Sequence, residues 1–310
     1  MTARLPNLII AGLGKAGTTS LFWYLSQHPE ICTSQVKEIR YFSAAAAGGT
    51  LPPIEEYASH FTHCGDRRYV MEASPQYFHG GAPVIEAIRR SLDRPRVVLS
   101  LRDPIDRLWS QYRFAKTRMG PVPGTMTFDQ YVDRSLGIRR ERQPLTPDNQ
   151  PYWHLSGGFY VEHISAWLDA FGGDLRVVFF EQLADEPATV VVGLCRWLGI
   201  DEEPASRFTY SVENKTEQFR SGLLQRAALA LNSERLLGSR RRLKAPLRRL
   251  YYGINRKPPR EQMSDEARRI LEAEFGPSNH ALSEALRIRG YTDLPDWLAG
   301  RSTAGSNRSP

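Results

Sequence analysis

The chain has 310 residues, of which 41% are hydrophobic and 10% aromatic, and this is enough to build a sizeable core. No stretch approaches eighteen uninterrupted apolar residues, so we expect no membrane-spanning helix. The formal net charge of +7 favours anionic partners: a phosphorylated nucleotide, an acidic glycan, a lipid head group or nucleic acid.

The first residues lead directly into a short apolar run and then glycines, without the longer apolar region and cleavage site of a signal peptide. The cysteines are Cys32, Cys64 and Cys195, which are far apart and odd in number. We therefore expect neither a disulfide framework nor a zinc or iron–sulfur site. Unpaired cysteines fit a reducing compartment, and we predict a cytoplasmic protein.

The first predicted unit is a strand, a loop and a helix. The apolar residues 8–11 suit a buried parallel strand, and a glycine-rich loop follows over residues 12–17. Thr18 then opens a helix that ends at Pro29.

Two further units repeat this order. Residues 97–101 form a strand, and Asp103 with Pro104 is typical of a helix start. The third strand covers residues 177–180, and residues 190–198 form its helix. Strands that alternate with helices predict an α/β fold with three layers, in which helices flank a central parallel sheet.

The remaining chain is less regular. Residues 115–149 read as a helix plus loops, and residues 264–298 as two closing helices. Arg235–Arg260 contains ten Lys/Arg and no Asp/Glu, which indicates either a solvated surface or a contact for an anionic substrate or membrane. We predict one domain over residues 1–300 and a disordered tail over residues 301–310.

The loop after the first strand carries the strongest chemical signal. Gly12, Gly14 and Gly17 surround Lys15, and the hydroxyl residues 18–20 follow. Glycines allow backbone N–H groups to surround a phosphate, and a helix N-terminus favours negative charge. The alternative is a glycine turn that only joins a strand to a helix.

The loop differs from that of nucleoside triphosphatases. A Walker loop has lysine directly after its last glycine and then a hydroxyl for magnesium. Here Thr18 occupies the lysine position, and the lysine is Lys15, inside the loop. The pattern indicates a P-loop-like site for a phosphate ester that requires no metal.

Residues 6–21, which read PNLIIAGLGKAGTTSL, resemble the 5′-phosphosulfate loop of sulfotransferases that use 3′-phosphoadenosine-5′-phosphosulfate (PAPS). Bacterial members and the heparan sulfate branch look most similar. The resemblance implies that PAPS is the co-substrate and that Lys15 is catalytic. It also implies that one run of residues binds the nucleotide: Lys15, Ala16, Gly17, Thr18, Thr19 and Ser20.

Residues 96–112 resemble the segment of this family that binds the 3′-phosphate. Arg102 follows a strand end, where such sheets bind ligands, and its guanidinium can hold a phosphate through two hydrogen bonds. The resemblance assigns Arg102 and Ser110 to the 3′-phosphate. An ion pair of Arg102 with Asp103 or Asp106 is the alternative.

Residues 214–220 fall where relatives close over the nucleotide, which implies that Lys215 and Arg220 also bind it.

The acceptor side rests on two further segments. Residues 36–42 resemble a Lys-Glu segment of the heparan branch that supplies the general base, which implies that Glu38 is catalytic. We expect burial by aromatic neighbours to raise the pKa of Glu38; an ordinary surface Lys-Glu pair is the alternative. Arg40, where that branch often has histidine, is a predicted substrate contact.

Residues 72–78 resemble a segment that lines the acceptor cleft, and Tyr77 is a predicted substrate contact there. The resemblance implies sulfuryl transfer to a hydroxyl, with an amine as second choice, on a glycan, lipid or secondary metabolite. A P-loop kinase and a basic membrane- or nucleic-acid-binding module remain alternatives. We predict no nucleic-acid partner, and peripheral membrane contact through Arg235–Arg260.

Overall fold

The computed structural model describes residues 4–116, 121–211, 218–219, 256–257 and 261–299. These residues belong to two compact units. The first contains residues 1–107, 155–214 and 271–310, and the second contains residues 108–154 and 215–270. The single domain predicted for residues 1–300 stays a prediction, and the predicted tail lies outside the described residues.

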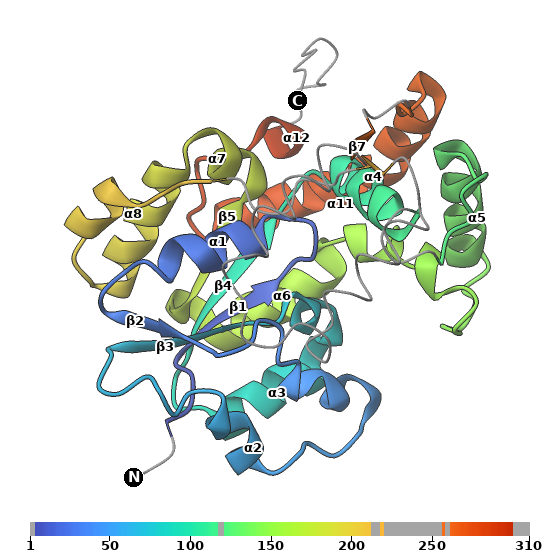
Figure 1. Cartoon of the computed structure of the whole chain (residues 1–310). Helices are drawn as coiled ribbons and strands as arrows, with labels where there is room; N and C mark the ends of the chain where they lie inside the picture. The colour runs from blue at the N-terminus through green and yellow to red at the C-terminus, as the bar shows by residue number, and fades with distance from the viewer. Residues whose placement is uncertain (1–3, 117–120, 212–217, 220–255, 258–260, 300–310) are drawn as a thin grey trace. The chain divides into compact units, whose positions relative to one another are not determined.

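The first unit is built on a parallel sheet of five strands in the order β2-β3-β1-β4-β5 (Figure 1). The strands are β1 (Leu8–Gly12), β2 (Ile31–Thr33), β3 (Tyr69–Ala73), β4 (Arg96–Leu101) and β5 (Leu175–Phe179). The predicted parallel sheet is confirmed, and β2 and β3 are additions to it. Because all strands run the same way, the chain leaves each of them at one edge, where ligands of such sheets bind.

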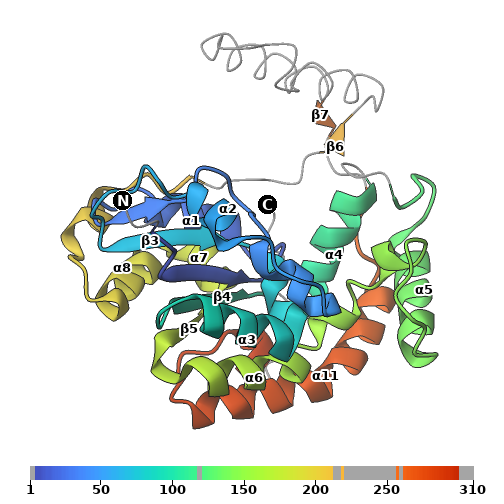
Figure 2. The ribbon, with the colours of Figure 1, turned by 90° about the horizontal axis from the view of Figure 1, so that it is seen from below.

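Helices cover both faces of this sheet (Figure 2). On one face lie α1 (Thr18–Leu25), α7 (Phe180–Asp185) and α8 (Pro187–Leu198); on the other lie α3 (Gly81–Ser91) and α6 (Val161–Phe171). Strand residues alternate between the two cores: Leu8 and Ile10 pack with the first set, and Ile9 with the second. This arrangement confirms the predicted three layers.

The buried face of α6 shows how sequence spacing forms the second core. Ile164, Trp167, Leu168 and Phe171 recur at helical spacing and are all buried. Trp167 also donates from its indole nitrogen to the carbonyl of Phe78 at 3.1 Å, so its one polar group is satisfied. Leu282 and Leu286, from the first-unit part of α11 (Asp265–Ile288), join the same core.

Shorter elements complete the first unit. They are α2 (Ile54–Ser59), α12 (Asp296–Ala299) and the 3-10 helices η1 (Tyr41–Ala47), η2 (Pro75–Gly80), η5 (Ser156–Gly158), η6 (Gly172–Asp174) and η7 (Glu203–Arg207). The two closing helices predicted over residues 264–298 are confirmed as α11 and α12.

The expectation of unpaired cysteines is wrong. Cys32 in β2 and Cys64 form a disulfide, with Cα atoms 5.4 Å apart, whereas Cys195 is a buried free cysteine. The pairing arises because β2 runs beside β3, and Cys64 lies in the turn that leads into β3. Disulfides are typical of oxidising compartments, so the cysteines do not support a cytoplasmic location, and that location stays a prediction. In the described part of the chain, no helix has the length and apolarity to cross a bilayer.

The second unit contains the later part of α4 (Pro104–Phe114), α5 (Phe128–Arg140), η4 (Gln150–Tyr152) and the short antiparallel pair β6 (Gln218–Phe219) and β7 (Arg256–Lys257). Thr127 and Gln130 form a capping box that starts α5. Within this unit Lys116 pairs with Glu261 at 2.8 Å. Apart from β7, the basic segment Arg235–Arg260 lies outside the described residues.

Candidate active site

The phosphate loop, which we define as residues 12–20, connects β1 to α1 at the carboxyl edge of the sheet. The backbone N–H of Leu13 donates to the carbonyl of Ser100 at 2.8 Å, and the Ser100 hydroxyl donates to the carbonyl of Ala16. Lys15 has a φ of 68°, a left-handed conformation that non-glycine residues rarely adopt. The neighbouring strand β4 therefore fixes the path of the loop around Lys15.

Gly17 fits a position that admits no side chain. Its φ is 77°, and a Cβ atom there would come within 2.9 Å of Phe180 and 3.1 Å of Leu183. Gly17 is also the N-cap of α1, a helix with no side-chain cap and no acidic residue in its first turn. The first backbone N–H groups of a helix lack intrahelical acceptors and carry partial positive charge. This end of α1 is therefore suited to an anion.

Arg102 lies against the phosphate loop, as the sequence predicted for a second cationic group at this edge. Its Nη1 donates to the carbonyl of Lys15 at 3.2 Å, and its guanidinium carbon lies 4.2 Å from the centre of the Phe180 ring. Tyr160 donates its hydroxyl to the Arg102 carbonyl at 2.8 Å. The structure thus brings Lys15 and Arg102 to one place in the first unit.

The Nε of Arg102 is buried and has no acceptor among the residues that the structure describes. A buried donor without a partner is costly, so this atom is suited to an anionic ligand. The carboxylate of Asp103 accepts a hydrogen bond from the backbone N–H of Ile105 at 2.8 Å, at the start of α4.

Phe180 is a residue that the sequence analysis missed in this site, because residues 177–180 read as one strand. The strand ends at Phe179, and Phe180 begins α7. Its ring lies beneath Arg102 and also closes the space beside Gly17. The feature of the sequence that could have identified Phe180 is its position as an aromatic residue directly after the end of a strand.

Glu38 lies between two cations. Its carboxylate oxygens are 3.2 Å from Lys37 Nζ and 2.8 Å from an Arg40 guanidinium nitrogen. Burial acts to raise the pKa of Glu38, but the hydrogen bond from Arg40 and the charge of Lys37 outweigh it and lower the pKa. The expected raised pKa is therefore wrong, because the flanking cations were not weighed against the aromatic residues.

A second carboxylate, which the sequence analysis did not select, has the property expected of Glu38. Glu72 in β3 is fully buried, and burial raises its pKa to about 7, although hydrogen bonds from Tyr77, Tyr57 and Ser74 oppose the rise. The Ser74 hydroxyl donates to Glu72 at 3.3 Å and accepts from the backbone N–H of Arg40 at 3.0 Å. Glu72 thus supports the backbone two residues from Glu38.

Tyr77 lies beneath the same segment. Its side chain is fully buried, and its hydroxyl accepts from the backbone N–H of Phe42 at 3.2 Å. These contacts favour a supporting role for Tyr77, and its predicted contact with substrate stays a prediction.

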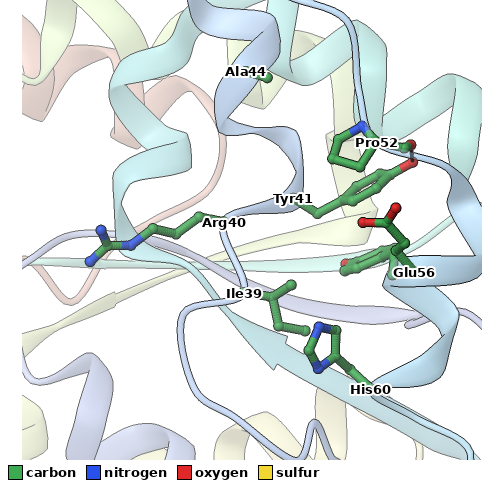
Figure 3. A pocket seen from close by; sticks show the side chains of 8 residues that line it. Ile39, Arg40, Tyr41, Ala44, Pro52, Glu56 and His60 are labelled. Carbon is green, nitrogen blue, oxygen red and sulfur yellow. Dashed lines mark hydrogen bonds between the residues drawn. The ribbon is translucent and has the colours of Figure 1, made fainter.

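A pocket of about 240 Å³ opens beside Ile39 and Arg40, which directly follow Glu38 in the chain (Figure 3). Aliphatic, aromatic, acidic and basic residues line it: Ile39, Arg40, Tyr41, Ala44, Pro52, Glu56, Tyr57 and His60. Figure 3 shows Tyr41, Pro52 and Glu56 together on one side, with the Arg40 guanidinium directed away from them. Tyr41 and Tyr57 stack with ring centres 4.3 Å apart.

The described structure does not test three of the predicted nucleotide-binding residues. Ser110 lies in the part of α4 that belongs to the second unit. Lys215 and Arg220 lie outside the described residues. Their predicted roles stay predictions.

Comparison with known proteins decides the family. A family model described as "Sulfotransferase domain" matches residues 5–225, more than half of the chain. The chain belongs to the sulfotransferase family. The family that residues 6–21 and 96–112 resemble is thereby confirmed.

The curated relatives are longer proteins. The bifunctional heparan sulfate N-deacetylase/N-sulfotransferase 1 of Caenorhabditis briggsae is 26% identical over 302 residues, which cover 95% of this chain and 31% of that protein. The membrane-associated sulfotransferase kil1 of Dictyostelium discoideum is 39% identical over 114 residues, which cover 36% of this chain and 23% of kil1. The chain thus spans about a third or less of the relatives that it matches.

A crystal structure of a sulfotransferase from Alicyclobacillus acidocaldarius shares the fold of this chain. The TM-score is 0.66 at 23% sequence identity, with 95% of this chain and 99% of that chain covered. The predicted P-loop-like α/β fold is confirmed by this similarity.

Proposed function

We propose that this sulfotransferase transfers a sulfuryl group from PAPS to an acceptor hydroxyl, with an amine as the second choice. The proposal rests mainly on the position of the Arg102 side chain. A guanidinium is held against the phosphate loop while its buried Nε lacks an acceptor among the described residues. Such a donor fits a phosphate.

The residues of the phosphate loop fit the other end of the nucleotide. Backbone N–H groups near Gly17 to Thr19 and the hydroxyls of residues 18–20 would hold the 5′-phosphate, because Gly17 keeps the entrance to α1 free of a side chain. Arg102 would hold the 3′-phosphate. Ser110, Lys215 and Arg220 complete the set by resemblance.

PAPS, when bound, supplies the sulfuryl group and a phosphate leaving group. The chain's task is to position the reactants and to neutralise negative charge as it develops. We assign this task to Lys15 because it lies within the loop, and its ammonium would stabilise the leaving oxygen. The fixed loop backbone means that little reorganisation is needed during the reaction.

Glu38 is the proposed general base, and Glu72 positions it. The lowered pKa of Glu38 keeps its carboxylate ionised at neutral pH, so that it can accept a proton, although it is a weaker base than we expected. Glu72 acts through Ser74, which holds the backbone of Arg40. The two carboxylates have pKa values displaced in opposite directions, which is typical of distinct roles in one site.

The acceptor would enter through the pocket beside Arg40. Its stacked tyrosines and its charged rim suit a ring-containing molecule with polar substituents. Glycan, lipid-linked and secondary-metabolite hydroxyls form the acceptor class that we propose. Because the name of a relative includes N-sulfotransferase, amino sugars belong in the test set.

The test is formation of 3′-phosphoadenosine-5′-phosphate (PAP) by the purified chain with PAPS and a panel of alcohols, phenols, glycans and amino sugars. We expect acceptor-dependent PAP formation, which Glu38→Gln lowers by about 10²-fold, at the lower end of what loss of a general base costs. Asp93→Asn, which changes an exposed carboxylate outside the nucleotide and acceptor segments, is the matched control. Turnover that is unchanged in Glu38→Gln would remove Glu38 from the reaction.

A further inference from the structure

Cys32, His63 and Cys64, which we call the thiol site, gather beside the edge strand β2. The Nε2 atom of His63 lies 3.5 Å from the Cys32 sulfur and 3.9 Å from the Cys64 sulfur. All three potential ligand atoms lie within 4.8 Å of one another. Cys64 is buried, Cys32 is half-buried and His63 is exposed, so the group opens to solvent on the side of the imidazole.

Backbone hydrogen bonds hold the thiol site in place independently of the disulfide. The N–H of Cys64 donates to the carbonyl of Phe61 at 3.0 Å, and that of Gln35 donates to the carbonyl of His60 at 3.1 Å. Cys32 itself is paired with Val70 in the sheet. Because these bonds do not involve sulfur, the two cysteines and the histidine should remain neighbours when the disulfide opens.

The two sulfur-to-nitrogen distances match those of a tetrahedral metal site, and the two sulfurs, which are bonded to each other in the disulfide, must move apart on reduction before both can be ligands. Zinc binds sulfur at about 2.3 Å and imidazole nitrogen at about 2.0–2.1 Å, which puts a sulfur and a nitrogen on one tetrahedral zinc about 3.5 Å apart. The observed distances are 3.5 and 3.9 Å. Two thiolates and one imidazole would leave a fourth position open to water.

We propose that the thiol site is a redox-controlled binding site for one zinc-like divalent cation. In the disulfide state the sulfurs are bonded to each other and are not available as thiolates. A dithiol reductant transfers two electrons and two protons: the S–S bond breaks, two cysteine thiols form, and the dithiol becomes a disulfide. Cation binding then releases the two thiol protons as Cys32 and Cys64 become ligands.

This inference reverses our sequence-based expectation that zinc chemistry is absent. It does not depend on the proposed sulfuryl transfer, because the site is formed by residues that the reaction does not use. The sequence did not predict the thiol site because Cys32 is 32 residues from Cys64, a separation unlike that of a compact zinc motif.

The experiment compares the full chain in its oxidised form with the same protein after reduction by dithiothreitol and its removal under argon. Each form is titrated with Co²⁺, a spectroscopic substitute, and then with Zn²⁺. We expect one equivalent of Co²⁺ to bind the reduced chain with thiolate-to-metal charge-transfer absorption and the visible bands of a tetrahedral site. Zn²⁺ should displace it, and the oxidised chain should show neither signal.

Matched variants identify the ligands. His63→Ala keeps both thiols and should weaken Zn²⁺ binding at least tenfold, whereas His60→Ala, which removes an imidazole three residues earlier, should leave it unchanged. Absence of thiolate absorption in the reduced wild-type chain would overturn the proposal without any variant. Equal Zn²⁺ affinity in His63→Ala and the wild type would overturn the assignment of His63.

Discussion

The phosphate loop and the acceptor-side segment, which we define as residues 31–78, are organised in different ways. The loop is one continuous stretch of chain. It is fixed by contacts with Ser100 in β4 and with Arg102, which directly follows β4. The acceptor-side segment joins pieces distant in sequence through the Cys32–Cys64 disulfide and the link from Glu72 through Ser74 to Arg40. A site formed by one contiguous stretch of backbone can be predicted from the sequence. A site formed by segments that pair across the fold can be recognised only from the structure.

The largest effect that we expect concerns Lys15. If the loop supplies the charge that stabilises the leaving oxygen, Lys15→Ala should lower turnover by roughly 10²- to 10³-fold, the loss typical of one electrostatic stabiliser. Binding of PAP should fall less, because backbone groups remain. Rates of PAP formation and PAP titrations measure the two quantities. Equal transfer rates in variant and parent would reject this assignment.

The disulfide tests the acceptor-side segment. Opening a cross-link between residues 32 positions apart should lower the free energy of unfolding by about 3–4 kcal/mol in the chain-entropy model. Urea unfolding with and without dithiothreitol, in the presence of a metal chelator, measures this difference. A Cys32→Ser/Cys64→Ser chain should unfold at the midpoint of the reduced protein and should not respond to the reductant. An unchanged midpoint on reduction would show that the bond does not stabilise this segment.

Glu72 should make stability fall as pH rises. The pKa of Glu72 is raised from 4.5 to about 7 in the folded chain, so between these values the native state binds more protons than the unfolded state. Stability then decreases with pH across this window, by roughly 3 kcal/mol at 1.36 kcal/mol per pKa unit. Glu72→Gln should remove this decrease in urea unfolding measured from pH 4.5 to pH 8.

Glu38→Gln is the matched comparison, because the pKa of Glu38 is lowered. Its stabilising contribution is present above the ordinary pKa and is lost as pH falls, so its substitution should flatten the acid side of the profile. Parallel pH profiles for Glu72→Gln and the parent would contradict the account of Glu72.

The smallest effect concerns the glycines of the phosphate loop. Gly17→Ala places a Cβ 2.9 Å from Phe180 at a φ of +77°, and overpacking together with the strain of a left-handed alanine should cost about 1–3 kcal/mol, with weaker PAP binding. Gly14→Ala is the matched control, since a Cβ there meets nothing within 4 Å. Chemical unfolding and PAP titration of both variants measure the difference, and equal losses in both would contradict a packing role for Gly17.

The sequence predicted the parallel sheet, the helix that starts at Pro104 and the loop around Lys15, because each depends on local patterns of apolar residues, caps and glycines. It did not predict β2, β3 or the disulfide, since short strands carry little periodicity and their pairing is decided by distant residues. It selected Glu38 but assigned the wrong direction to its pKa, because the balance of burial against Lys37 and Arg40 depends on distances. The sequence around Glu72 did not indicate that this carboxylate is buried, because β3, in which it lies, was not predicted.

Calorimetric titration of PAP against ADP tests the central claim, which is that Lys15 and Arg102 bind opposite ends of one doubly phosphorylated adenosine. We predict that the wild-type chain binds PAP at least tenfold more tightly than ADP. We also predict that Arg102→Ala removes this preference by lowering PAP affinity more than ADP affinity, because only PAP has a 3′-phosphate, whereas both ligands use the loop that Arg102 helps to fix. Equal affinities for PAP and ADP in the wild-type chain would contradict the account.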